Sequence, residues 1–207
     1  MRRRTLNFAI GMLLVGPTAM LLKGGVVQAQ HVVDVGKAME RRMVGDPDAK
    51  ISLVEYFSLT CSHCAHFHIE TYPKLKDAYI DTGKVKMEFR DFPLDQWALR
   101  AAAMARCVPS KHYNAMIDVL MRQQSSWAGS DDVLESLLRI AQLAGMKRDF
   151  ARACMTNAKL LDAIIAMRLE GNKKYDVSST PSFLLNGKKI NAFEFGDFEK
   201  LLAKAGV

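Results

Sequence analysis

Hydrophobic and polar positions alternate with two different periods along this chain, and the changes of period mark its secondary structure. Residues 51–57 and 85–92 alternate apolar with polar side chains over much of their length, as half-buried strands do. The segment between them, from residue 61 or 65 to residue 80, has the period of an amphipathic helix. Strand, helix and strand in this order predict a βαβ unit with a right-handed crossover.

The stretch from residue 96 to residue 175 follows a helical period almost throughout and is rich in Ala, Leu and Met. We expect Ser130 to cap the third helix of this stretch and Gly145 to follow its end. Five helices are expected, at residues 96–107, 110–122, 131–144, 147–155 and 158–175.

A strand pattern returns near the C-terminus. Residues 182–185 and 188–190 flank Asn186-Gly187, a dipeptide that favours the type I′ turn of a β-hairpin. A last helix is expected at residues 197–205. The order of elements therefore predicts one α/β domain that an all-helical block interrupts.

The domain boundaries follow from the same pattern. The expected parts are a lead-in at residues 30–48, a first α/β part at 49–95, the helical insertion at 96–175 and a second α/β part at 176–207.

The first 29 residues have the composition of an export signal. Three arginines, Arg2 to Arg4, precede a mostly apolar stretch, and small residues before Gln30 predict cleavage after Ala29. A retained membrane anchor is the alternative, although Pro17 and Lys23 make the stretch a poor transmembrane span. We therefore expect the mature protein to be exported, to the periplasm or to the cell exterior.

The positive charge of the chain belongs in part to this signal. The whole sequence has 29 Lys and Arg against 22 Asp and Glu, a formal net charge of +7. Loss of residues 1–29 would remove four positive charges and no negative one, which leaves +3. No basic stripe with interleaved aromatic residues is present, so the composition argues against nucleic acid as a partner.

The sequence Cys61-Ser62-His63-Cys64 carries the most specific chemistry. Cys61 lies at or beside the start of the expected helix, where unpaired N–H groups and the helix dipole favour an anion. Such a site lowers the pKa of a cysteine and stabilises the reactive thiolate. His63 lies between the two thiols and could add positive charge or a hydrogen bond. The motif predicts a thiol–disulfide exchange centre.

Two other readings of the motif remain open at this point. Cys61 and Cys64 could bind zinc with His66 and His68, although all four would then come from one short segment rather than from two separate elements. A purely structural disulfide between such close neighbours would remove little chain entropy. We expect His66 and His68 to be solvated or packed residues, and we expect neither a metal nor another cofactor.

Export also affects the two remaining cysteines, Cys107 and Cys154. Disulfides persist outside the cytoplasm, and four cysteines can pair in three ways. We favour Cys61 with Cys64 and Cys107 with Cys154; the second bond would be worth about 4 kcal/mol on the chain-entropy model. Two free, buried thiols are the alternative for Cys107 and Cys154.

These features together resemble a known family. A C-x-x-C motif at the head of a helix, Thr180-Pro181 before a late hairpin, and a helical block between them are similar to the thioredoxin fold of DsbA-type periplasmic oxidoreductases. The resemblance covers about residues 45–206. The arrangement of four cysteines resembles the DsbA relatives that are common in alphaproteobacteria.

The resemblance implies roles for particular residues. The proline that matches Pro181 is cis in the family and lies against the active-site disulfide, and the backbone at Thr180 could pair with a substrate strand. From the residues alone, a trans proline at the start of an edge strand is the simpler reading. Glu55 matches the buried acid that handles the proton of Cys64; a solvated carboxylate at the end of a strand is the alternative.

The chain also departs from the family pattern at two positions. The best-known oxidases have Pro-His between the cysteines, whereas this chain has Ser62-His63. They often have Val before the cis proline, whereas Thr180 is found there in isomerases of the DsbC type. Both departures bear on whether the protein oxidises thiols or isomerises disulfides.

The expected function is oxidation of thiols in unfolded exported proteins, with re-oxidation by a membrane partner of the DsbB type as the resemblance implies. A disulfide isomerase or reductase is the closest alternative, and a non-enzymatic chaperone-like binding module is another. Isomerases resembling DsbC dimerise through an N-terminal domain, for which residues 30–50 are too short. We therefore expect a monomer.

Overall fold

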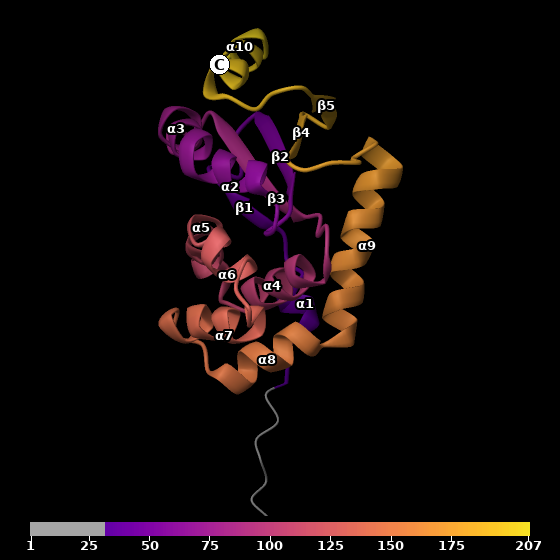
Figure 1. Ribbon diagram of the computed structural model, residues 1–207. Helices are drawn as coiled ribbons and strands as arrows, with labels where there is room; N and C mark the ends of the chain where they lie inside the picture. The colour runs from indigo at the N-terminus through magenta and orange to yellow at the C-terminus, as the bar shows by residue number, and fades with distance from the viewer. Residues whose placement is uncertain (1–31) are drawn as a thin grey trace, which may run out of the picture. The chain divides into compact units, whose positions relative to one another are not determined.

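The computed structural model describes residues 32–207, so the expected export signal at residues 1–29 lies outside the described residues. Within the described part of the chain, no helix is long and apolar enough to cross a bilayer. Figure 1 shows the described residues as a sheet with helices on its faces and a group of helices beside it.

The sheet has five strands in the order β1-β3-β2-β4-β5. The central strand β2 (Ile51–Phe57) pairs in parallel with β3 (Val85–Asp91) and antiparallel with β4 (Ser182–Leu185). The edge strands are β1 (Arg42–Val44) and β5 (Lys188–Ile190). Six of the seven β2 residues are buried, because helices cover both faces of this strand. The predicted α/β fold class is confirmed.

One helical segment connects β2 to β3, as the sequence predicts, but it is not regular. It consists of α2 (Ser62–His66), the π-helical turn η1 (Phe67–Thr71), α3 (Tyr72–Leu75) and the π-helical turn η2 (Lys76–Ile80). The first wide turn comes shortly before Pro73, which has no N–H to donate to the regular helical ladder. Figure 1 shows this segment along the sheet.

Six helices lie between β3 and β4. The sequence predicts five of them to within three residues at each end but misses the short helix α6. Their bounds are α4 (Gln96–Arg106), α5 (Tyr113–Arg122), α6 (Gln124–Ala128), α7 (Val133–Leu143), α8 (Arg148–Thr156) and α9 (Ala158–Tyr175), and a 3₁₀ turn, η3 (Ser110–His112), precedes α5.

The start of α7 corrects one expectation. Asp132 rather than Ser130 is the N-cap, because its side chain accepts a hydrogen bond of 2.9 Å from the Glu135 backbone N–H. Ser130 instead accepts from the Asp132 N–H and so shapes the turn before the cap. Gly145 follows the end of α7 with a positive φ of 80°, as expected.

The C-terminal hairpin agrees closely with the sequence. Asn186 and Gly187 both have positive φ, 48° and 79°, as a type I′ turn requires. The last helix, α10 (Phe195–Lys204), begins two residues before the predicted start, with a capping box formed by Glu194 and Asp197.

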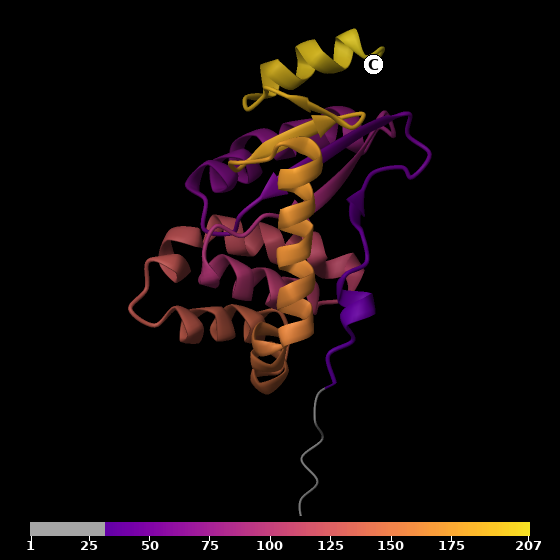
Figure 2. The same cartoon turned by 90° about the vertical axis from the view of Figure 1, so that its right-hand side faces the viewer.

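Two short N-terminal elements were not predicted: α1 (Val35–Ala38), and the strand β1 described above. The long helix α9 runs from the group of helices to the sheet, as Figure 2 shows. It packs so closely on β2 that a Cβ at Gly171 would lie 2.5 Å from the Tyr56 ring.

Candidate active site

Cys61 and Cys64 lie where β2 passes into α2. Cys61 is the N-cap of α2, with extended backbone angles, and Cys64 lies in the first turn. The turn between strand and helix is closed by a hydrogen bond from the Cys61 N–H to the Ser58 carbonyl. The motif is therefore at the helix N-terminus, as the sequence predicts.

Gln124, which the sequence did not mark as a site residue, holds the backbone of this turn through its side chain. Its side-chain amide donates hydrogen bonds of 2.9 Å to the backbone carbonyls of Leu59 and Cys61. Gln124 is the first residue of α6, so this short helix anchors the active-site turn to the helical block. No pattern in the sequence marks Gln124, because one glutamine among polar residues carries no periodic signal.

The two thiols differ in accessibility. Both are free cysteines, but Cys61 retains 9% of its surface whereas Cys64 retains none. Ser62 and His63 between them are exposed. The His63 ring packs against the Phe193 ring in a T-shaped arrangement, with ring centroids 5.9 Å apart. Only Cys61 of the pair is placed to react with another molecule.

The loop before β4 brings a distant segment onto Cys61. The Thr180–Pro181 peptide bond is cis, and the Cys61 thiol donates a hydrogen bond of 3.2 Å to the Thr180 carbonyl. The Ser182 hydroxyl donates to the Ser179 carbonyl, which holds the loop in shape. The Thr180 carbonyl, which precedes the cis proline, therefore lies against the Cys61 sulfur.

The surroundings of Cys61 favour its thiolate. They lower the pKa of Cys61 from its usual 9 to about 5. The largest cause is a hydrogen bond from the Cys64 thiol; the Thr180 hydroxyl and the backbone N–H groups of Cys64 and His63 also stabilise the thiolate. Burial acts in the opposite direction, because it disfavours the charged form.

The surroundings of Cys64 have the opposite effect. Burial raises the pKa of Cys64 well above its usual value, and the hydrogen bond that this thiol gives to Cys61 raises it further. The negative charge of Glu55 acts in the same direction. The pair therefore consists of one accessible sulfur that ionises readily and one buried sulfur that retains its proton.

Glu55 lies on β2 and is fully buried, so it is not a solvated carboxylate. Its Oε2 lies 3.0 Å from Nε2 of His68, a buried residue of η1. His66 differs from His68: it is exposed, and its ring stacks on Phe193. Among the described residues, no cluster of three or more His, Cys, Asp or Glu side chains is arranged to hold a metal ion.

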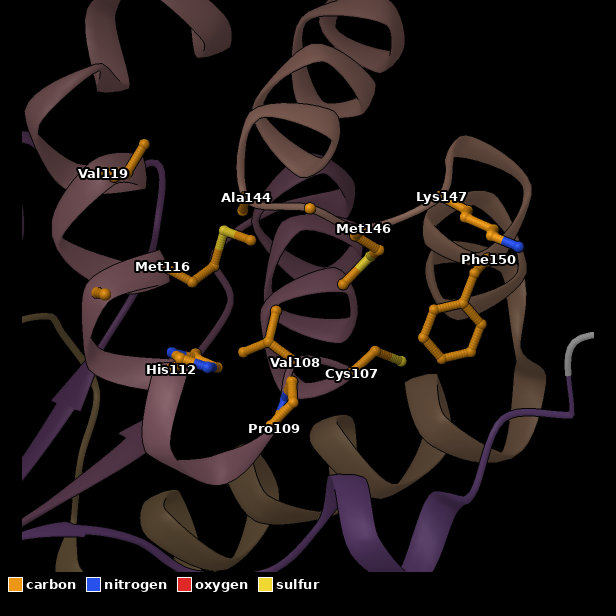
Figure 3. Close-up of a pocket in the computed structure, with 12 residues that line it drawn as sticks. Cys107, Val108, Pro109, His112, Met116, Val119, Ala144, Met146, Lys147 and Phe150 are labelled. Atoms are coloured by element: carbon orange, nitrogen blue, oxygen red, sulfur yellow. The ribbon is translucent and has the colours of Figure 1, made fainter.

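Cys107 and Cys154 are joined by a disulfide, which links the end of α4 to α8. Beside it lies an apolar groove of about 600 Å³ (Figure 3). Met116, Met146 and Phe150 line this groove, and His112 and Lys147 add nitrogen atoms. Neither Cys61 nor Cys64 reaches the groove, so it is separate from the site of the free thiols.

Comparison with known proteins gives a consistent result. A protein family described as Thioredoxin matches residues 37–204. The crystal structure of alpha-DsbA1 from Wolbachia pipientis is similar with a TM-score of 0.74 and 32% identity, over 80% of this chain and 90% of that one. A protein-disulfide isomerase from Novosphingobium aromaticivorans is similar with a TM-score of 0.71 and 28% identity, over 81% of this chain and 98% of the other.

A curated protein of Rickettsia bellii, named "Putative protein-disulfide oxidoreductase", is 33% identical over 164 residues. The match includes 79% of this chain but only 63% of the Rickettsia protein. The chain thus spans about three fifths of the length of such relatives.

Proposed function

The chain belongs to the DsbA-type family of thioredoxin-fold proteins, and we propose that it is a thiol–disulfide oxidoreductase that introduces disulfide bonds into exported proteins. One observation carries the proposal: Cys61 is the accessible N-cap of α2 and Cys64 is fully buried, so their pKa values shift in opposite directions. A disulfide whose reduced form contains a stabilised thiolate is a strong oxidant, because that stability favours reduction.

The reaction begins with the Cys61–Cys64 disulfide. A substrate thiolate attacks Sγ of Cys61, the bond to Cys64 breaks, and Cys64 leaves as a thiolate that takes up a proton. A second substrate thiolate then attacks the substrate sulfur of the mixed disulfide. Cys61 leaves as a thiolate, and its low pKa makes it a good leaving group. The substrate loses two electrons and the enzyme gains them.

The neighbouring residues support these steps. We assign substrate binding to the backbone at Thr180 and to Pro181, because the Thr180 carbonyl contacts the accessible sulfur and Pro181 follows it across a cis peptide bond. Glu55 supplies the proton that Cys64 takes up, since it is buried and close enough for its charge to raise the pKa of that thiol. His63 and Ser62 form the exposed surface next to Cys61.

The proposed redox chemistry indicates the cellular compartment and the partners of the protein. We propose export by residues 1–29 with cleavage after Ala29, because disulfides form in oxidising compartments. The partners are unfolded exported proteins with reduced cysteines and a membrane re-oxidant of the DsbB type. The Cys107–Cys154 bond has a structural role, and the protein acts as a monomer without a cofactor.

The reduction potential tests the proposal. Purified protein lacking residues 1–29 is equilibrated with glutathione buffers, and the fraction of reduced Cys61–Cys64 is measured. We expect a potential near that of strong oxidants, ~−120 mV. A value near that of thioredoxin, ~−270 mV, would contradict an oxidase.

A disulfide isomerase is the second candidate, because the Novosphingobium relative has that name. Two assays separate the activities: oxidation of a reduced substrate, and reactivation of a substrate with scrambled disulfides. An oxidase is faster in the first assay, whereas an isomerase is faster in the second.

A further inference from the structure

A buried pair of ionisable side chains lies beneath the active site. Glu55 on β2 and His68 on η1 retain 0% and 3% of their side-chain surface, and Oε2 and Nε2 are 3.0 Å apart. His68 follows Cys64 by four residues, so the two lie on the same side of the helical segment. The charge of Glu55 also acts on the Cys64 thiol, so the pair lies near the buried sulfur.

Three polar atoms of this pair have no hydrogen bond. Both carboxylate oxygens of Glu55 and Nε2 of His68 are buried without a partner of good geometry, although Nε2 and Oε2 are in contact. Buried polar atoms almost always have partners, so an exception requires an explanation such as a catalytic role. These two side chains can satisfy each other when a proton lies between them.

The surroundings exclude water from the pair. Four aromatic rings surround His68 with centroids 5.6 to 5.7 Å away: Phe57, Phe67, Tyr72 and Phe89. The ionisable groups that interact with the charge of Glu55 are Cys64 on α2, Tyr72 on α3 and Tyr113 on α5. The charged groups beyond them act on the two phenols: Asp81 and Asp118 on Tyr72, and Asp91, Arg42 and Arg106 on Tyr113. Tyr72 and Tyr113 stay neutral, since burial raises the pKa of both phenols.

We propose that His68 is a positioning residue of the exchange reaction, which holds Glu55 in place as the proton donor to Cys64 by donating its Nε2–H to the carboxylate. The inference rests on the proposed function and adds a residue to it. Glu55 alone would become an isolated buried anion after it gave up its proton, at a large cost in free energy. The His68 N–H offsets part of that cost.

The step is balanced in protons and electrons. A substrate thiolate forms a bond with Sγ of Cys61, and the Cys61–Cys64 bond breaks with its electron pair on Cys64. The carboxylic proton of Glu55 moves to Sγ of Cys64. The resulting carboxylate accepts the hydrogen bond from His68, which keeps its own proton throughout. In re-oxidation the same proton returns from Cys64 to Glu55.

Two substitutions at the same position test the proposal. His68→Phe retains a ring in the aromatic surroundings but removes the N–H, whereas His68→Gln loses the ring but retains an N–H donor. We expect attack by reduced glutathione on the oxidised protein to slow by roughly ten- to a hundredfold in H68F. This loss is no larger than the lower end of the contribution of a general acid, about a hundredfold. We expect H68Q to restore most of the rate. His112→Gln, at an exposed histidine, is the control.

The pH profile gives a readout that packing does not affect. Without the His68 N–H, the Glu55 carboxylate loses its hydrogen-bond donor, so the pH dependence of the rate, corrected for glutathione ionisation, should differ between H68F and wild type. A rate and profile equal to wild type in H68F would overturn the proposal, as would an H68Q variant that is slower than H68F. The latter result would assign His68 a packing role alone.

A measurement on the unaltered protein covers the case in which H68F does not fold. Nitrogen NMR of the His68 ring should show a different Nε2 signal in the oxidised and reduced protein, because Glu55 exchanges its proton with Cys64. Identical signals would overturn the proposal. Absence of any exchange with glutathione in the wild-type protein would instead refute the proposed function, so the two failures are distinct.

Discussion

Cys61 and Thr180 are 119 residues apart in the sequence, yet the Cys61 thiol donates a hydrogen bond of 3.2 Å to the Thr180 carbonyl. The Thr180 hydroxyl is buried and has no hydrogen bond in the structure. When Cys61 loses its proton, this hydroxyl can donate to the sulfur, which is one cause of the low pKa of Cys61. Thr180 therefore accepts from the thiol and donates to the thiolate.

The first prediction concerns this hydroxyl. Thr180→Val retains the shape of the side chain but removes the donor, so we expect the pKa of Cys61 to rise above about 5. Ultraviolet absorbance of the thiolate across a pH titration measures the change. Thr180→Ser, which retains a hydroxyl, is the control. An unchanged pKa in the valine variant would mean that the hydroxyl does not bind the thiolate.

The second prediction is the pH dependence of the reduction potential. Below the pKa of Cys61, about 5, reduction takes up one more proton from solvent than above it, because Cys61 then remains a thiolate. For a two-electron couple, the fall of the potential with pH should therefore become less steep by about 30 mV per pH unit above that pH. A slope that does not change up to pH 8 would show that Cys61 is protonated at neutral pH.

The third prediction concerns a buried ion pair that joins the sheet to the helical block. Arg106 on α4 donates from Nε to Asp91 at the end of β3, and both side chains are almost fully buried. Asp91→Asn leaves the Arg106 guanidinium without a counter-charge, and such a loss typically costs 3–5 kcal/mol, a general figure of order of magnitude. Urea unfolding followed by circular dichroism measures the difference.

The control for this prediction is an exposed pair. Asp118 and Arg122 on α5 are 2.8 Å apart, and both are about half exposed. Asp118→Asn should change the free energy of unfolding by less than about 1 kcal/mol. Equal losses in the two variants would contradict the idea that burial determines the cost.

The strands show how far the sequence alone can reach. The boundaries of β2, β4 and β5 match the predicted ranges, because alternation and the Asn186-Gly187 turn are local signals. The strand β1 was missed because it has three residues, and its buried Arg42 does not look like a strand residue. The terminal guanidinium nitrogens of Arg42 donate to the carbonyls of Ala38 and Arg106 and to the Ser110 hydroxyl, partners that only the fold brings together.

The site shows the same limit. The spacing of Cys61 and Cys64 identifies them as a redox pair. The contact between Glu55 and His68 cannot be predicted in this way, because the two residues lie on different elements. A partial signal existed: Cys64 and His68 share a helix face, and Glu55 shares its strand face with the apolar Leu53 and Phe57. What the sequence lacks is the register that places these two faces against each other. Gln124 had no signal at all.

The last prediction tests the contact between α9 and the sheet. An alanine normally stabilises a helix by up to about 1 kcal/mol relative to glycine. At Gly171, however, the added Cβ would lie 2.5 Å from Cε1 of Tyr56. The Tyr56 ring is not free to move away, because its hydroxyl accepts a hydrogen bond of 2.8 Å from Arg90 and its edge packs on Phe92.

Overpacking of this kind costs roughly 1–3 kcal/mol, which exceeds the gain in helix propensity. We therefore expect Gly171→Ala to lower the free energy of unfolding by about 1–2 kcal/mol, measured by urea denaturation at equal m-values. Gly196→Ala is the matched control, because a Cβ at Gly196 in α10 meets no atom within 4 Å. That variant should be as stable as wild type or more stable. If G171A were also stabilised, α9 would not pack on β2 as closely as the structure places it, and the helix that connects the helical block to the sheet would have room to shift.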